Sequence, residues 1–502
     1  MTESVVIVGA GSAGCVLANR LSEGGDRRVT LVEAGPDYFP GSLPDDLRDG
    51  GRNSLVSHDW GYRHRPTPDH ISFPFPRGKV VGGSSAVNTC IALRGQPEDY
   101  DEWADRGLPE WGWEQCLPAF RRLETDLDFD DEWHGDEGPL PLRRHPPEEW
   151  TPWQEAFVEA CTSLGFERCD DSNRPGSSGV GPHAMNKIDG RRISAADAWL
   201  TPAVRGRPNL SIRDRTMVRR VLFDGRRAVG VEVIRAGEVD ELHADEVVLC
   251  AGAVNTPGIL LRSGIGPPDQ LGRMGVEQFI NHRNVAGRLL DHPGVAVFLL
   301  PRLRSGTSRK DPLIQTVCRF GSSVNGLSND ILMQPGSAVP MPRVSLPMVS
   351  VMFALGKPRG TGYLRFESAD PSQAPVVESR LFEHPEDRHV AMNAIERAFE
   401  VTRTPPMRDM ARVVWPRPKA FADRDLLDET FTTVCDSGYH PCGTVPMGGD
   451  DDPRAACDGQ GRLRRTEGLR IADASLMPTI PSANIHLTVL MMAERIADMM
   501  TG

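Results

Sequence analysis

The feature that most constrains this chain is a glycine-rich turn placed directly after its first apolar run. Residues 4–8 are expected to form a strand, and Gly9-Ala10-Gly11-Ser12-Ala13-Gly14 follows with the pattern G-x-G-x-x-G. The first glycine permits a tight turn, the second lets a pyrophosphate approach the backbone, and the third lets helix and strand pack closely. We expect residues 15–22 to form a helix whose N-terminus faces the phosphates.

The residues after this helix support a dinucleotide site. The run 28–33 (RVTLVE) predicts a second strand, so the chain opens with one βαβ unit of a doubly wound sheet. Glu33 ends this strand, where a carboxylate accepts hydrogen bonds from both ribose hydroxyls and repels a 2′-phosphate. The turn and Glu33 together favour FAD or NAD over NADP.

The composition excludes several classes of function. The chain has 502 residues, 39% hydrophobic and 25% charged, which indicates one large globular enzyme or two closely joined domains. Its net charge of −12 argues against nucleic acid or anionic lipid as a partner. No apolar run is long enough to span a membrane, and the first one starts too early for a signal peptide, so we expect a cytoplasmic protein.

The ten cysteines are scattered and form no CxxC pair or zinc-site spacing. We therefore expect reduced thiols and no metal.

Further elements can be predicted along the chain. Residues 36–77 are rich in Pro, Gly, Asp and His and are expected to form a long surface excursion, whereas 205–252 contain successive strand patterns. The Pro- and Ser-rich stretch 300–350 is expected to be irregular and to separate two halves of the chain. Helices are predicted over 385–403 and over about 485–500, where apolar residues recur at helical spacing.

Four further segments resemble the glucose–methanol–choline (GMC) oxidoreductase family. Two are similar to its signature patterns, and all four, with the N-terminal turn, follow the family's order over essentially the whole chain. They are Arg77-Gly78-Lys79-Val80-Val81-Gly82-Gly83-Ser84-Ser85-Ala86-Val87-Asn88, the run 252–266 (GAVNTPGILLRSGIG), His440-Pro441-Cys442-Gly443-Thr444 with Met447-Gly448, and the run 473–484 (DASLMPTIPSAN).

The resemblance implies an α/β fold with a Rossmann-like FAD-binding domain and a discontinuous substrate domain built on a mostly antiparallel sheet. The implied organisation is an N-terminal FAD-binding region over 1–297, a substrate-domain connection over 298–357, and a C-terminal region over 358–502. The C-terminal region completes the substrate domain and the FAD site. It also implies oxidation of a small-molecule alcohol by hydride transfer to the flavin, with oxygen or another electron acceptor as the final oxidant.

The same resemblance places the cofactor contacts. The FAD-binding residues it implies are Gly9, Gly11, Ser12, Ala13, Gly14, Glu33, Ala34, Gly82, Gly83, Asn88, Thr89, Cys90, Ile91, Val218, Ala251, Tyr439, Asp473, Ala474 and Asn484. Some relatives carry a histidine within the glycine-serine segment that bonds covalently to the flavin. The corresponding position here is Val87, which has no nucleophile, so we predict non-covalent FAD.

His440 and Asn484 match the family's catalytic His–Asn pair. Removing the hydroxyl proton of an alcohol requires a base with a pKa near neutrality, and a second group must hold the developing alkoxide. We expect His440 to be that base and Asn484 to hold the substrate oxygen. His486 is a candidate substrate contact, because some relatives use two histidines here. Cys442 is expected to be a small packed residue.

Other functions remain compatible with this sequence. The foremost is a lyase with a structural FAD, similar to the family's hydroxynitrile lyases, and a photodecarboxylase-like use of the fold is a more remote one. A nicotinamide-dependent flavoprotein reductase would need a second G-x-G-x-x-G turn on a strand–helix unit, which the sequence lacks. The alcohol, the choice between oxidase and dehydrogenase, and the oligomeric state are left open.

Overall fold

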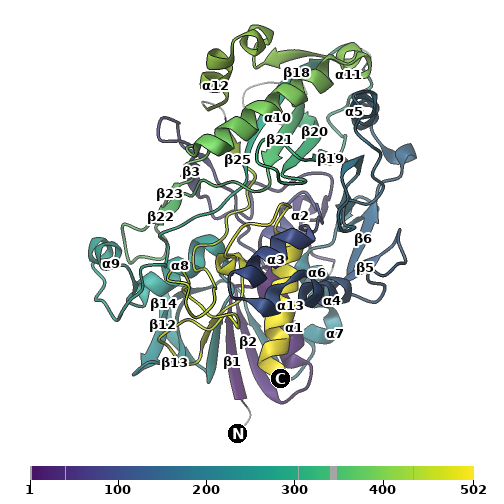
Figure 1. Cartoon of the computed structure of the whole chain (residues 1–502). Coiled ribbons are helices and arrows are strands. Elements are labelled where there is room, and N and C mark those ends of the chain that lie inside the picture. Colours follow the sequence, from purple (N-terminus) through teal and green to yellow (C-terminus); the bar gives the residue numbers. More distant parts are fainter. Residues whose placement is uncertain (1–2, 40, 304, 340–347, 433–434) are drawn as a thin grey trace.

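Two sheets of different type organise the chain in the computed structural model (Figure 1). The structure describes residues 3–39, 41–303, 305–339, 348–432 and 435–502. A parallel sheet lies near the N-terminus, in the order β11-β2-β1-β15-β26. Its strands are β1 Glu3–Val8, β2 Arg27–Val32, β11 Leu210–Arg213, β15 Glu246–Leu249 and β26 Leu469–Ile471.

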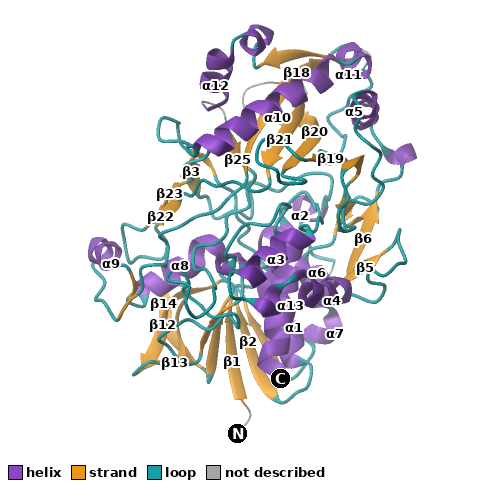
Figure 2. Cartoon of the chain, in the orientation of Figure 1, coloured by secondary structure: helices purple, strands orange, loops and turns teal. Residues whose placement is uncertain are grey.

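Helices from both ends of the chain pack side by side on this sheet (Figure 2). The helix α1 Ser12–Ser22 lies beside α13 His486–Thr501, which confirms the two helices expected there. Glu494 of α13 is fully buried and holds Arg20 of α1 at 2.8 Å, Arg122 at 3.1 Å and the Trp199 indole nitrogen at 3.1 Å. A buried carboxylate is stable only when paired in this way, so these contacts fix the C-terminal helix against the dinucleotide turn.

The second sheet is antiparallel and stands at the other end of the molecule. Its order is β24-β18-β21-β20-β19-β7, and β25 pairs with the start of β18. The strands are β7 Gly179–Pro182, β18 Pro293–Pro301, β19 Thr316–Phe320, β20 Ile331–Val339, β21 Met348–Leu355, β24 Ala411–Trp415 and β25 Asp436–Ser437. The helices α10 Pro385–Arg403 and α5 Pro152–Ser163 cover one face of it, and α10 has the bounds predicted from the sequence.

The expectation that 300–350 is irregular was wrong, because β19, β20 and the start of β21 lie in it. One face of these strands packs in a core, whereas the other carries Gln334, Gly336 and Ser350 next to a cavity. Polar and small residues on that face, together with Pro335, interrupt the apolar alternation by which a strand is recognised. Residues 340–347 lie outside the described part of the chain.

The remaining elements connect and flank the two sheets. In the strand-rich region 205–252, β11 and β15 of the parallel sheet, with β12 Thr216–Asp224 and β13 Arg227–Arg235, confirm the predicted strands. The strand β14 Glu238–His243, which was not predicted, completes a meander with β12 and β13. Smaller sheets comprise β3 Arg63–Arg65, β4 Phe73–Pro74, β22 Tyr363–Arg365 and β23 Val376–Glu378; β5 Glu124–Asp126, β6 Leu140–Arg144 and β8 Ala184–Met185; β9 Lys187–Ile188 and β10 Arg191–Arg192; and β16 Ile265–Gly266 and β17 Ile280–Asn281.

Further helices are mostly short. They are α2 Asp45–Arg48, α3 Pro97–Asp105, α4 Trp113–Leu123, α6 Ala195–Trp199, α7 Pro202–Arg205, α8 Gly252–Arg262, α9 Pro268–Met274, α11 Pro405–Met410 and α12 Arg424–Thr432, with the 3₁₀ turns Gly83–Ala86, Pro109–Trp111, Pro147–Glu149, Pro418–Ala422 and Ala474–Leu476. Within the described ranges, none of the helices has the length and apolar character needed to cross a membrane. All ten cysteines are described, and each is a free thiol.

Candidate active site

A cavity of about 790 Å³ lies between the parallel and the antiparallel sheet. The glycine turns around Gly9 and Gly83 line one part of it, and strands β18, β20 and β21 line another. Most of the residues that the sequence assigned to cofactor and substrate meet here. The lining includes Gly9, Gly11, Ser12, Ala13, Glu33, Ala34, Gly83, Asn88, Thr89, Ile91, Val218, Ala251, Tyr439, His440, Asp473, Ala474, Asn484 and His486.

The dinucleotide turn has the geometry that its three glycines predict. Gly9 has a φ of +99°, and a Cβ there would lie 2.6 Å from the carbonyl oxygen of Cys250. A Cβ on Gly14 would lie 1.9 Å from the Gly9 carbonyl oxygen, so Gly14 serves the packing of helix on turn and does not line the cavity. Gly11 is open toward the cavity, because a Cβ there would meet only the Gly83 Cα at 3.9 Å.

The two glycine motifs meet at the floor of the cavity. Gly83 has a φ of +54°, and a Cβ on it would lie 2.6 Å from the Cα of Gly11. The amide of Gly82, outside the lining, donates to the carbonyl of Ala10 at 2.7 Å. Glycine is thus required for the approach of one loop to the other, which forms a continuous backbone surface for a ligand.

Glu33 sits at the position expected of the ribose-binding carboxylate. Its side chain is buried, and it accepts hydrogen bonds from the Ala10 amide at 3.0 Å and the Gly35 amide at 2.8 Å. Burial raises the pKa of Glu33 to about 7, against the pull of these backbone donors. Each oxygen keeps a lone pair for a further donor such as a ribose hydroxyl.

Asp473 joins two elements at the edge of the site. One of its oxygens accepts from the Gly252 amide at 2.8 Å and the Thr256 hydroxyl at 2.6 Å, so it caps the start of α8. The other oxygen accepts from the amide and the hydroxyl of Ser475. Burial raises the pKa of this carboxyl group.

The segment 87–91 runs along the cavity wall. Val87, Asn88, Thr89 and Ile91 line the cavity, whereas Cys90 is fully buried behind it, with its sulfur 3.6 Å from the Arg192 guanidinium. Together with the glycine cradle and the Glu33 carboxylate, these residues fit a bound FAD.

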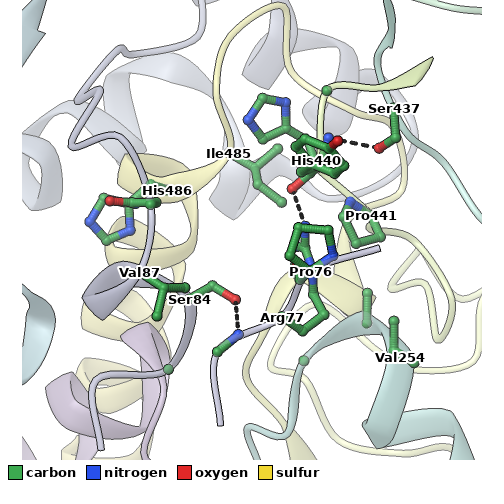
Figure 3. A pocket seen from close by; sticks show the side chains of 18 of the residues that line it. Pro76, Arg77, Ser84, Val87, Val254, Ser437, His440, Pro441, Ile485 and His486 are labelled. Atoms are coloured by element: carbon green, nitrogen blue, oxygen red, sulfur yellow. Dashed lines mark hydrogen bonds between the residues drawn. The ribbon is translucent and has the colours of Figure 1, made fainter. Parts of the chain in front are cut away.

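His440 and Asn484 lie side by side although 44 positions separate them. His440 Nε2 is 3.1 Å from Asn484 Nδ2, and both residues line the cavity. His440 follows β25, whereas Asn484 lies two residues before the start of α13, so the two sheets must dock before the pair can form. Figure 3 shows His440 near Pro441 on one side of the pocket and His486 and Val87 toward the other.

A second histidine, His292, sets the tautomer of His440. Its Nε2 lies 3.1 Å from the Gly356 carbonyl and 2.9 Å from the Pro481 carbonyl, so this nitrogen carries a proton and donates. Burial lowers the pKa of His292 to about 4, so it is neutral and its Nδ1 has a lone pair. His440 Nδ1, at 3.0 Å, must therefore donate to it, which leaves His440 Nε2 without a proton.

The backbone around His440 is held just as firmly. Asp291 accepts from the His440 amide at 2.9 Å and from the His292 amide at 2.8 Å. Tyr439 has a φ of +63°, and Arg77 donates to its carbonyl at 2.7 Å. Burial, His292 and Arg77 hold the pKa of His440 well below the usual range, and so below the near-neutral value expected of the base from the sequence; the imidazole is neutral at physiological pH.

Sequence reasoning missed Asp291 and His292. Their only local signal is the dipeptide before Pro293, at the start of β18, and nothing in it connects them to His440.

His486 begins α13, and its Nδ1 lies 3.4 Å from the Ser12 hydroxyl at the start of α1. Its Nε2 is buried without a partner, and burial lowers its pKa to about 4. His486 thus lies beside the glycine turn that is expected to bind the pyrophosphate, and its contact with a substrate stays a prediction.

A cluster of potential metal ligands, Glu124, Asp126 and His134, lies outside the cavity lining. Arg94 pairs with Glu124 at 2.5 Å and Arg144 with Asp126 at 2.8 Å. These ion pairs account for the cluster as a buried network that ties β5 to β6.

Residues 4–294 and 358–493 match the two parts of the family described as GMC oxidoreductase. The chain belongs to the GMC oxidoreductase family. It is an FAD-dependent oxidoreductase, which confirms the resemblance found in the sequence and the mixed α/β fold predicted from it.

Several relatives match this GMC oxidoreductase over its whole length. One is "5-(hydroxymethyl)furfural oxidase" of Methylovorus sp. (strain MP688), 34% identical, with 99% of each chain covered. Another is "oxygen-dependent choline dehydrogenase" of Rhizobium rhizogenes, 33% identical over 100% of this chain and 96% of the relative. Among solved structures, pyridoxine 4-oxidase from "Mesorbium loti" superposes with a TM-score of 0.90 at 32% identity, covering 99% and 98% of the two chains.

Proposed function

We propose that this chain oxidises a primary or secondary small-molecule alcohol to a carbonyl compound, with His440 as the general base and Asn484 as the donor to the substrate oxygen. The main support is the lone pair that His292 leaves on His440 Nε2, 3.1 Å from Asn484 Nδ2. FAD, when bound, supplies the acceptor for the hydride that leaves the carbinol carbon. The alcohols in the names of the relatives agree with this class of substrate.

The two side chains divide the work on the hydroxyl group. An alcohol entering between them donates its hydroxyl hydrogen to His440 Nε2 and accepts a hydrogen bond from Asn484 Nδ2. As the proton moves to Nε2, negative charge grows on the substrate oxygen, and the Asn484 amide stabilises it.

We also propose the residues that hold the cofactor. Gly11, Ser12 and Ala13 at the start of α1 would bind the pyrophosphate and Glu33 the ribose, while Asn88 to Ile91 would follow the flavin ring. Val218 would contact adenine through its backbone. Because Val87 is aliphatic, the FAD should be released by acid or SDS, and flavin that stays with the denatured chain would contradict this.

The test of the base is an anaerobic stopped-flow measurement of flavin reduction by a panel of alcohols. His440→Ala should slow reduction by about 100- to 10,000-fold while FAD stays bound, because the proton then has no acceptor in place. His243→Ala, which removes a surface histidine, is the matched control and should reduce as the wild type does. An unimpaired rate in His440→Ala would refute the assignment.

Two further measurements separate the remaining alternatives. Redox silence with every alcohol, together with aldehyde release from a cyanohydrin, would identify a lyase instead. For an oxidoreductase, comparing reoxidation of the reduced enzyme by oxygen and by a quinone dye distinguishes an oxidase from a dehydrogenase.

A further inference from the structure

The antiparallel sheet presents one face of β18, β20 and β21 to the cavity. Cross-strand register places nine residues of this face in three rows, and all nine line the cavity. The rows are Gly294–Ala354–Leu332, Ala296–Met352–Gln334 and Phe298–Ser350–Gly336. We call these nine residues the chamber face. The alternating residues of the same strands, such as Val297, Met333 and Val351, pack in the core on the other side.

The chamber face is apolar and carries no ionisable side chain. Its two polar side chains are Gln334 and Ser350, and five of its nine positions are Gly, Ala or Ser, which makes room for a ligand. Three carboxylates line the cavity elsewhere: Glu33 and Asp473 in the glycine-turn part, and Asp436 next to Ser437. The two oxygens of Asp436 already accept from His64 Nε2 and the Tyr439 hydroxyl, each at 2.9 Å.

Gln334 is held in one orientation by a buried histidine. His183 is 1% exposed, and its Nε2 lies 3.0 Å from Gln334 Oε1. Burial lowers the pKa of His183 to about 4, so it is neutral and donates through Nε2 to that oxygen. The Gln334 amide nitrogen then has only the Met352 sulfur, at 3.5 Å, as a partner, and a thioether is a weak acceptor.

His183 adds a second, independent sign of a ligand. Its Nδ1 is buried, has no hydrogen-bond partner and belongs to a residue that lines the same cavity. A buried polar atom without a partner costs free energy that a bound ligand can recover. A donor on Gln334 and an acceptor on His183 thus stand together in an otherwise apolar chamber.

The position of this pair suits the far end of a substrate. Gln334 lies on β20, two strands from β18, a separation of about 10 Å at the usual strand spacing. His440 follows β25, which pairs with the first residues of β18. A molecule whose carbinol is at His440 can therefore extend across the chamber face toward Gln334.

We propose that Gln334 is a specificity-determining residue that donates a hydrogen bond to an uncharged oxygen on the substrate, remote from the reacting carbinol. The preferred substrates are uncharged alcohols that carry a second oxygen function, and cationic alcohols are disfavoured because the chamber face offers no carboxylate. This inference rests on the proposed alcohol oxidation for the placement of the carbinol.

The test compares alcohols that differ only at the remote end. Methoxybenzyl alcohols, meta and para, are matched by ethylbenzyl alcohols, which have nearly the same shape but no acceptor oxygen. The wild-type enzyme should oxidise the better methoxy isomer with a kcat/KM about 10-fold higher than that for the matching ethylbenzyl alcohol. This is the difference expected for one hydrogen bond. It should also prefer the uncharged tert-butyl analogue of choline to choline itself.

Two variants of Gln334 and one neighbour make the test specific. Gln334→Met keeps the volume but removes the donor, so kcat/KM should fall for methoxybenzyl alcohol and stay unchanged for ethylbenzyl alcohol. Gln334→Glu keeps an acceptor for His183 and adds a charge, so the preference should move toward choline. Leu332→Met, on the same face, is the control and should affect both benzyl alcohols alike.

The proposal would be overturned by equal rates with both benzyl alcohols in the wild type, by equal losses in Gln334→Met, or by a preference for choline. If no alcohol reduces the flavin, the proposed function fails, but the subsite can still be tested. Binding of methoxy- and ethylbenzaldehyde, followed by the flavin absorbance change, should then show the same preference and the same loss in Gln334→Met. Equal binding of the two aldehydes would refute the subsite by itself.

Discussion

The two parts of the cavity are built by different means. The part proposed to hold FAD is shaped by backbone: at Gly9 and at Gly83 the neighbouring loop lies so close that a Cβ does not fit. The substrate part is shaped by side chains that alternate along β18, β20 and β21. Backbone cradles require glycine at fixed spacing, whereas a sheet face accepts many residues of similar size.

This difference explains why one part is readable in the sequence and the other is not. A substitution in the glycine cradle should abolish cofactor binding, while a substitution on the chamber face should only change substrate preference. Four variants, from the largest expected effect to the smallest, probe the glycine cradle, Glu33, the His292–His440 pair and the chamber face.

Gly83→Ala should yield protein with almost no FAD. The new Cβ would lie 2.6 Å from the Gly11 Cα, so the two loops must separate and the cradle opens. Flavin absorbance relative to protein absorbance measures the loss. Gly190→Ala is the matched control, because Gly190 also has a positive φ, +75°, but no atom lies within 4 Å of its Cβ position. Full flavin content in Gly83→Ala would contradict the requirement for glycine at this position of the cradle.

Glu33→Gln should change how the stability of the FAD-free protein depends on pH. Burial raises the pKa of Glu33 to about 7 from 4.5, so its contribution to stability is full below the lower value and is lost as pH rises through the upper one. The uncharged glutamine avoids that loss and should gain up to about 3 kcal/mol over the wild type by pH 8. Urea unfolding at about pH 5 and about pH 8 measures the difference; parallel curves for the two proteins would contradict it.

His292→Phe should slow flavin reduction by about 10- to 100-fold without loss of FAD, the range seen when a partner that orients a catalytic group is removed. Phenylalanine offers no acceptor at the position of His292 Nδ1, 3.0 Å from His440 Nδ1, so nothing holds the proton of His440 on its Nδ1. His292→Gln can offer an amide oxygen in its place and should recover part of the rate. The pH profile of reduction should change in the Phe variant, and an unchanged profile with an unchanged rate would exclude this positioning role.

Ala354→Leu should have the smallest effect. Ala354 lies in the row of the chamber face nearest β25, so a larger side chain narrows the chamber without touching the glycine turns. We expect unchanged FAD content and a change in KM of about 10-fold or less that depends on substrate size. Loss of FAD in this variant would show that the two parts of the cavity are not independent.

Much of the cofactor part could be predicted because its signals are local. The turn 9–14 and Glu33 follow from residue type within a strand–turn–helix unit, and the segment 82–91 follows from the family resemblance. The helix at 385–403 is indicated by the residues at its start, and the helix at 486–501 by apolar spacing. The exceptions among the named cofactor residues, Gly14, Gly82 and Cys90, lie just behind the cavity lining. The order of the motifs was enough to predict the family, the fold class and FAD.

The substrate part and the environment of His440 depended on the tertiary structure. The sequence marked His440 and Asn484, but only the docking of the two sheets brings their nitrogens to 3.1 Å. It gave no sign of His292, whose lone pair decides which nitrogen of His440 is free, because the two histidines are 148 positions apart. Part of the chamber face lies in the stretch 300–350 that was expected to be irregular, and its residues become neighbours only through the pairing of three strands. Residue type fixes where backbone can bend, whereas long-range register decides which side chains meet.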